Sequence, residues 1–107
     1  ITAVQEEAPL VYVLMNDAAY GVIQNIQDAQ YGSRRHYSAL NTPDFGKLCE
    51  AVNMPHMLVS EIEDFAAALD EAIARPGPVV LEVDMCAIGP YAQSFAGPPA
   101  GAAGKAE

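Results

Sequence analysis

Leu10–Gly21 reads LVYVLMNDAAYG, an apolar run with β-branched and aromatic side chains that ends abruptly in the polar pair Asn16-Asp17. Pro9 precedes the run and a helical pattern follows it, so the composition predicts a strand over Leu10–Met15 that is covered on both faces. Open α/β sheets bind ligands just beyond the carboxyl ends of such strands, and function is therefore expected beside this pair. The alternative is a turn or helix N-cap, because both side chains readily bond nearby backbone amides.

Helical patterns occupy three further stretches of the chain. Gly21–Gln30 carries apolar residues at helical spacing. Thr42 is the predicted N-cap of a second helix with Pro43 at its first position, and Ser60 with Glu63 forms a capping box ahead of a third. The apolar faces of the last two helices are expected to pack on a sheet. These faces are Phe45, Leu48, Cys49 and Val52, and then Phe65, Ala66, Leu69, Ala72 and Ile73.

Two more strands alternate with these helices, over His56–Val59 and Val79–Val83. Alternation of strands and helices argues for an α/β fold with parallel pairing. Three strands would form an incomplete sheet in which the first strand lacks a neighbour. Such an open edge favours association with another chain.

The string around Asn16-Asp17 resembles the second half of the thiamine diphosphate motif of the acetolactate synthase, pyruvate decarboxylase and benzoylformate decarboxylase family. In that family a strand ends in an Asn-Asn pair, followed by two variable residues, often an aromatic residue, and a Gly that begins a helix. The resemblance continues through TPDF at residues 42–45, LCEA at 48–51 and GPVVLEV at 77–83. It implies a three-layer sandwich with a parallel sheet, the carboxyl-terminal part of a thiamine diphosphate-binding (PP) domain. We assign residues 1–86 to this domain and residues 87–107 to an irregular Gly/Pro/Ala-rich tail.

The resemblance also implies a Mg²⁺ ion that anchors the diphosphate of the cofactor. Carried over residue by residue, its ligands are the side chain of Asp17 and the backbone carbonyl of Ala19. Mg²⁺ prefers oxygen ligands and is usually held by few protein groups together with phosphates. The implied cofactor-binding residues are Asp17, Ala19, Tyr20, Gly21, Val22 and Ile23. For Val22 and Ile23, packing in the core is the alternative to facing the cofactor.

Two features differ from the family pattern. The family usually has Asn where this chain has Asp17, so the metal gains a negative ligand, which Mg²⁺ accepts. No Gly-Asp-Gly segment, the family's source of another metal ligand, occurs in these residues. The glutamate that activates the cofactor lies in a separate amino-terminal domain of the family. We therefore expect this chain to be the carboxyl-terminal part of a longer enzyme, to contribute no catalytic residue and to be inactive alone.

The reaction implied by the resemblance is that of a carboligase or decarboxylase acting on small 2-keto acids. Thiamine diphosphate serves as the electron sink in this chemistry, while the protein orients it. Flavin (FAD) is used by some relatives and is left open by these residues. A cytoplasmic homodimer or homotetramer is the expected full-length form. The alternatives are a stand-alone α/β interaction or regulatory module without cofactor, and a flavodoxin-like domain that binds a small molecule unaided.

Composition limits the possible partners. The chain has 107 residues, 51% of them hydrophobic, and a formal net charge of −9, which argues against binding to nucleic acid phosphates. No segment is long enough to cross a membrane. Cys49 and Cys86 are expected to be free thiols.

One basic cluster interrupts this acidic chain, in the loop that follows Gln30. Arg34 and Arg35 could bind a substrate carboxylate, but pairing with surface acids is the favoured interpretation. His36 is interpreted as a loop residue rather than a general base.

Overall fold

The computed structural model describes residues 1–89, which divide into two compact units. The first unit contains Ile1–Asp17 and the described residues from Thr42 onward, and the second contains Ala18–Asn41. The predicted boundary between domain and tail falls at residue 87, where helix α5, Met85–Ile88, is still continuing. The rest of the predicted tail, residues 90–107, lies outside the described residues.

A three-stranded parallel sheet forms the centre of the first unit. Its strands are β1, Val11–Asn16, β2, His56–Val59, and β3, Val79–Asp84. β3 lies in the middle and pairs with β1 on one side and β2 on the other, both in parallel. The prediction of an α/β fold with a parallel sheet is therefore confirmed.

One face of this sheet is apolar and carries the core. Side chains alternate between the two faces along a strand, so Val79, Leu81 and Val83 share one face of β3. All three are buried, with Leu81 and Val79 fully inaccessible. Helix α4, Phe65–Ala74, contacts β2 and β3, and its residue Ala72 is buried as well.

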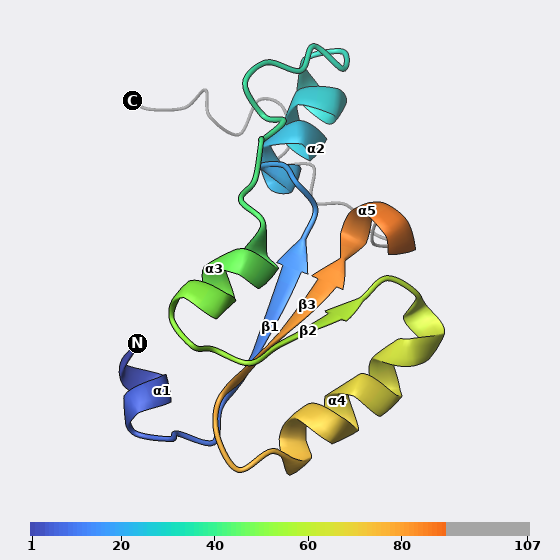
Figure 1. Cartoon of the computed structure of the whole chain (residues 1–107). Helices are drawn as coiled ribbons and strands as arrows, with labels where there is room; N and C mark the ends of the chain where they lie inside the picture. Colours follow the sequence, from blue (N-terminus) through green and yellow to red (C-terminus); the bar gives the residue numbers. More distant parts are fainter. Residues whose placement is uncertain (90–107) are drawn as a thin grey trace, which may run out of the picture. The chain divides into compact units, whose positions relative to one another are not determined.

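Helix α3, Phe45–Ala51, contacts β2 and lies on the other side of the sheet from α4 (Figure 1). A Cβ atom at Gly46 would lie 3.5 Å from Nδ1 of His56, so the start of α3 approaches the first residue of β2 closely. The two helices and the sheet form the three layers expected from the sequence. A short helix, α1, Thr2–Gln5, precedes β1.

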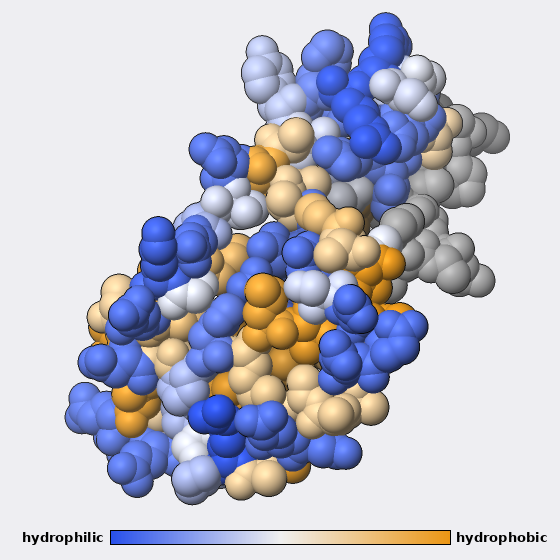
Figure 2. Space-filling view, turned by 45° about the vertical axis from the view of Figure 1, so that its right-hand side comes forward, coloured by the Kyte–Doolittle hydropathy of each residue, from blue (hydrophilic) through white to orange (hydrophobic). Residues whose placement is uncertain are grey.

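The prediction that the first strand is covered on both faces is wrong. Tyr12, Val13 and Met15 are 45%, 43% and 41% exposed, whereas the buried strand is β3. The reason is that α3 and α4 make their main contacts with β2 and β3, whereas the helix that contacts β1 is the short α5. The expected sheet, in which the first strand lacks one neighbour, is confirmed within the described residues. The space-filling view shows an apolar area that interrupts the hydrophilic surface (Figure 2).

Both predicted helix caps are corrected by the structure. Asp44, not Thr42, is the N-cap of α3, and its Oδ1 accepts a hydrogen bond from the backbone N–H of Lys47 at 3.0 Å. Ser60 does not cap α4, because a 3₁₀ turn, η1 at Ile62–Asp64, precedes that helix. A competing acceptor or turn close to the helix start decides which residue becomes the cap.

The predicted apolar faces of α3 and α4 are only partly buried. Cys49 and Ala72 are buried as expected, but Leu48 is 51% and Ile73 65% exposed, and Ala66 is exposed too. A sheet of three strands offers a small surface, so only the residues nearest the sheet are covered.

Helix α2, Gly21–Gln30, is the main element of the second unit and begins and ends where the sequence predicts. Ala19 and Ala39 form an isolated antiparallel bridge that closes the loop around it. Gln27 fastens this loop, since its Nε2 donates to the carbonyl of His36 and its Oε1 accepts from Oγ of Ser38. Among the described helices, none has the length and apolar character needed to span a membrane.

The corrected cap leads to a test by substitution. Asp44→Ala should lower the free energy of unfolding by about 1 kcal/mol, because it leaves the N–H of Lys47 without its acceptor. Thr42→Ala, the matched control, should change it by less than about 0.5 kcal/mol. Urea denaturation followed by circular dichroism measures both. Equal losses in the two variants would contradict the assignment of Asp44 as the cap.

The two cysteines, both free as expected, should differ in reactivity. Burial raises the pKa of the Cys49 thiol, and the nearby charge of Glu82 raises it further, whereas Cys86 is exposed. Since the thiolate is the reactive form, a thiol reagent at pH 8 should label Cys86 at least about tenfold faster than Cys49. Mass spectrometry of the digested protein measures the two rates. In denaturant the rates should converge, and a native Cys49 that reacts as fast as Cys86 would contradict its burial.

Candidate functional site

The second face of the sheet, which carries α3, is polar. Leu58 and Leu14 are the register partners of Glu82, and Asn16 is the partner of Asp84. Because partners in a parallel sheet point to the same side, His56, Glu82, Asp84 and Asn16 all lie on one face. One face of the same three strands is thus an apolar core and the other a row of polar groups.

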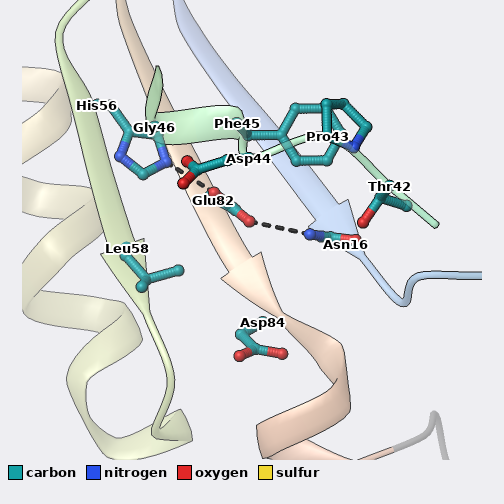
Figure 3. A pocket seen from close by; sticks show the side chains of 10 residues that line it. All are labelled: Asn16, Thr42, Pro43, Asp44, Phe45, Gly46, His56, Leu58, Glu82 and Asp84. Carbon is teal, nitrogen blue, oxygen red and sulfur yellow. Dashed lines mark hydrogen bonds and ion pairs between the residues drawn. The ribbon is translucent and has the colours of Figure 1, made fainter. Parts of the chain in front are cut away.

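Glu82 joins all three strands through its carboxyl group (Figure 3). Its Oε2 accepts a hydrogen bond from Nδ2 of Asn16 at 3.0 Å, and its Oε1 lies 2.7 Å from Nε2 of His56. Glu82 is only 8% exposed. A carboxylate accepts at both oxygens, so the histidine donates from Nε2 when Glu82 is ionised.

A pocket of about 410 Å³ opens over this network. Ten residues line it, and all are labelled in Figure 3. The acidic side chains in the pocket wall have structural partners. Oδ1 of Asp84 accepts from the backbone N–H groups of Cys86 and Ala87 at 3.0 and 3.1 Å, and Asp44 caps α3. In the described part of the chain, no three His, Cys, Asp or Glu residues are grouped so as to hold a metal.

The hydrogen bonds of Glu82, Asp84 and Asp44 can hold the ends of the strands and the start of α3 in position. Each carboxylate in the pocket wall accepts from a helix terminus or from a neighbouring strand. Buried charged groups are stable only when they are paired and hydrogen-bonded, which Glu82 achieves.

Asp17 lies one residue beyond β1, at the carboxyl end of the sheet, and its side chain is exposed. It is not the N-cap of α2, and neither is Asn16, because Tyr20 is the residue that precedes the helix. Ala18 follows with a φ of +53°, a left-handed conformation that turns the chain sharply. Its neighbour Ala19 forms the bridge to Ala39. The metal-ligand role of Asp17 and Ala19 stays a prediction.

The other predicted cofactor residues lie at the amino end of α2. No side chain caps this helix, and its first turn holds no acidic residue. The first backbone N–H groups of a helix have no partner within it and favour an anion. Val22 and Ile23 are 53% and 47% exposed, so the alternative of core packing is not what the structure shows. That they and Tyr20 face a cofactor remains a prediction, as does the role of Gly21.

The basic cluster behaves largely as the favoured interpretation expects. Arg35 pairs with Asp28, with Nε donating to Oδ1 at 2.7 Å, and this hydrogen bond lowers the pKa of Asp28. Arg34 donates from Nε to the carbonyl of Tyr31 at 3.0 Å. His36 is an exposed loop residue beside a hollow of about 290 Å³.

Sequence reasoning missed Glu82 and His56 as members of a site. The available signal was an ionisable residue inside a strand of otherwise apolar residues, VVLEV at 79–83, and a histidine at the start of HMLV at 56–59. A glutamate within a buried parallel strand needs partners, but nothing local identifies Asn16 and His56 as these partners.

Comparisons with known proteins agree with this architecture. The family model described as thiamine pyrophosphate enzyme, C-terminal TPP binding domain, matches residues 1–83. The acetolactate synthase large subunit of Pyropia yezoensis is 32% identical over 83 residues, which cover 76% of this chain and 14% of that protein. The mitochondrial acetolactate synthase catalytic subunit of Saccharomyces cerevisiae is 32% identical over 84 residues, or 78% of this chain and 12% of that protein.

A relative of lower identity matches a similar share of the chain. The mitochondrial acetolactate synthase of Schizosaccharomyces pombe is 28% identical over 82 residues, covering 77% of this chain and 12% of that protein. The chain thus spans 14% or less of the length of these three relatives. The resemblance noted in the sequence is confirmed: the chain belongs to the family of thiamine pyrophosphate enzymes, as a C-terminal TPP-binding domain.

Proposed function

We propose that this chain is the carboxyl-terminal part of a longer enzyme that uses thiamine diphosphate and Mg²⁺ to act on 2-keto acids. An acetolactate synthase-like carboligase or decarboxylase is the reaction type that the relatives support. The observation that carries the proposal is the position of Asp17, an exposed carboxylate directly beyond the carboxyl end of β1. Ligands of open α/β sheets bind at such strand ends.

The chain's own residues fit this cofactor in two respects. Asp17 offers the oxygen donor that Mg²⁺ prefers. The uncapped amino end of α2 offers backbone N–H groups and the positive end of the helix dipole to a diphosphate. Two ligands, the Asp17 carboxylate and the Ala19 carbonyl, are half of the metal anchor in this proposal.

The exposed apolar residues after Gly21 suit a further role. Val22 and Ile23 are each about half exposed, and an apolar wall beside a cofactor excludes water from the reacting atoms. Thiamine diphosphate, when bound, supplies the electron sink for decarboxylation of the 2-keto acid. This chain supplies no proton donor or base in the proposal, and its residues bind and orient.

Substitution of Asp17 tests the metal assignment in the full-length gene product. Asp17→Ala should weaken Mg²⁺-dependent thiamine diphosphate binding at least about tenfold, since even indirect partners of metal ligands cost tenfold to a hundredfold. Asp17→Asn keeps an oxygen ligand and should bind within about threefold of wild type. Titration calorimetry at several Mg²⁺ concentrations measures the affinity.

Asp70→Ala is the matched control, because Asp70 is an exposed acid on α4 in the first unit. Its affinity should equal that of wild type. Unchanged Mg²⁺-dependent binding of thiamine diphosphate by Asp17→Ala would contradict the assignment of Asp17 as a metal ligand. A full-length wild-type protein that binds no thiamine diphosphate would instead favour a stand-alone interaction module.

The isolated 107-residue chain provides a second test. It contains no Gly-Asp-Gly segment, so the metal anchor has only half of its protein ligands. Carbon dioxide release from pyruvate, with saturating thiamine diphosphate and Mg²⁺, should not exceed the rate in buffer. Turnover by this chain alone would contradict the expectation that the remaining machinery lies elsewhere.

A further inference from the structure

Glu82 is the buried ionisable group for which the proposed function has no use. It is 8% exposed and lies in the central strand, within the segment Val79–Val83, whose other residues are apolar. Both of its carboxyl oxygens have partners, one in each neighbouring strand. Burial of a carboxylate costs desolvation free energy, and an apolar residue at the same place is often at least as stable. The presence of Glu82 therefore points to a role other than stability.

The partner in β1 is the residue that immediately precedes Asp17. Asn16 is the last residue of that strand, and its Nδ2 donates to Oε2 of Glu82 at 3.0 Å. With the nitrogen engaged, the amide oxygen of Asn16 points away from Glu82 (Figure 3). The hydrogen bond therefore ties the end of an edge strand to the rigid centre of the sheet.

The partner in β2 holds the other side of the carboxyl group. His56 lies 2.7 Å from Oε1, and its ring lies next to Gly46 of α3, where an added Cβ would be in ordinary van der Waals contact with Nδ1 at 3.5 Å. The side chains of Glu82 and His56 are 10% and 20% exposed, so water competes little for this contact. Glu82 thus has one oxygen in a partly buried contact with His56 and presents the other to Asn16.

We propose that Glu82 is a positioning residue that fixes the carboxyl end of β1 by holding Asn16, with His56 as its support. The chain leaves the sheet directly after Asn16, so this hydrogen bond fixes the position of the backbone from which Asp17 extends. An edge strand with one neighbour frays more readily at its end than a central strand. The consequence for metal binding rests on the proposed function, whereas the effect on β1 does not.

Three variants separate the hydrogen bond from general stability. Glu82→Leu introduces an apolar side chain of similar size and removes both acceptor oxygens. Glu82→Gln keeps one acceptor oxygen for Asn16 and can turn its NH₂ group toward His56 if that ring carries its proton on Nδ1. Val83→Ala, the control, weakens the same strand on the opposite, apolar face, where Val83 is 3% exposed.

Hydrogen–deuterium exchange of the cofactor-free full-length product, followed by mass spectrometry, is the first measurement. Glu82→Leu should accelerate exchange about tenfold in the peptide that covers the end of β1, as expected for the loss of one hydrogen bond to a charged group. Glu82→Gln should stay within about twofold of wild type. Val83→Ala should differ from Glu82→Leu because it should accelerate exchange in α4, the helix that packs on the apolar face of β3.

Magnesium affinity is the second measurement, made with thiamine diphosphate present. The Mg²⁺ concentration for half-maximal cofactor binding should rise about tenfold in Glu82→Leu and less than about threefold in Glu82→Gln and Val83→Ala. If Glu82→Leu does not fold, Asn16→Ala removes the same bond from the other partner and should show the same local acceleration of exchange.

Two results would overturn the proposal: wild-type exchange at the end of β1 in Glu82→Leu, or equal perturbation by Glu82→Gln and Glu82→Leu. The failure of the proposed function looks different. If the wild-type protein binds no cofactor, the proposed function is wrong and the Mg²⁺ affinity cannot be measured. The hydrogen–deuterium exchange of the cofactor-free variants still decides the role of Glu82.

Discussion

Hydrogen bonding of β3 to a strand on each side is the constraint on which the rest of this structure depends. The central position buries Val79, Leu81 and Val83 on the face toward α4, and these residues are half of the buried hydrophobic residues in the described part of the chain. The same pairing presents Glu82 on the opposite face with a neighbouring strand at each oxygen. Both the stability of the sheet and the geometry of its polar face therefore follow from one strand.

One face of the sheet is stabilised by apolar packing and the other by polar contacts. Apolar side chains on one face contribute through removal of surface from water, which demands no particular orientation. The polar face depends on directional hydrogen bonds, which require that Asn16 and His56 meet Glu82 at defined distances. Parallel pairing brings the ends of β1 and β3 to one edge, where Asn16 and Asp84 are register partners. Helices or turns begin at once beyond both strands, as in other α/β proteins that bind ligands at this edge.

Comparison of the predicted and observed elements shows where local information suffices. Helix α2 and the positions of all three strands follow from hydrophobic periodicity, which acts within one or two turns of the chain. The predicted caps at Thr42 and Ser60 are wrong because competing residues a few positions away occupy the helix starts. The expected burial of β1 is wrong for another reason. An apolar strand composition indicates that a strand can be buried, and the helices that pack on the faces of the sheet decide whether it is.

The sequence by itself determined the types and order of the elements, the parallel α/β class and membership of the thiamine pyrophosphate enzyme family. The elements and the fold class follow from periodicity and turn residues, and the family follows from the resemblance of short motifs; all of these are local features of the chain. Only the tertiary structure decided that β3 is central, that β1 is an edge, and that Glu82 meets Asn16 and His56. Those partners lie 66 and 26 positions away along the chain, and their contact depends on strand order and register. Strand order and register arise from the packing of the whole sheet, so no short segment of sequence contains them.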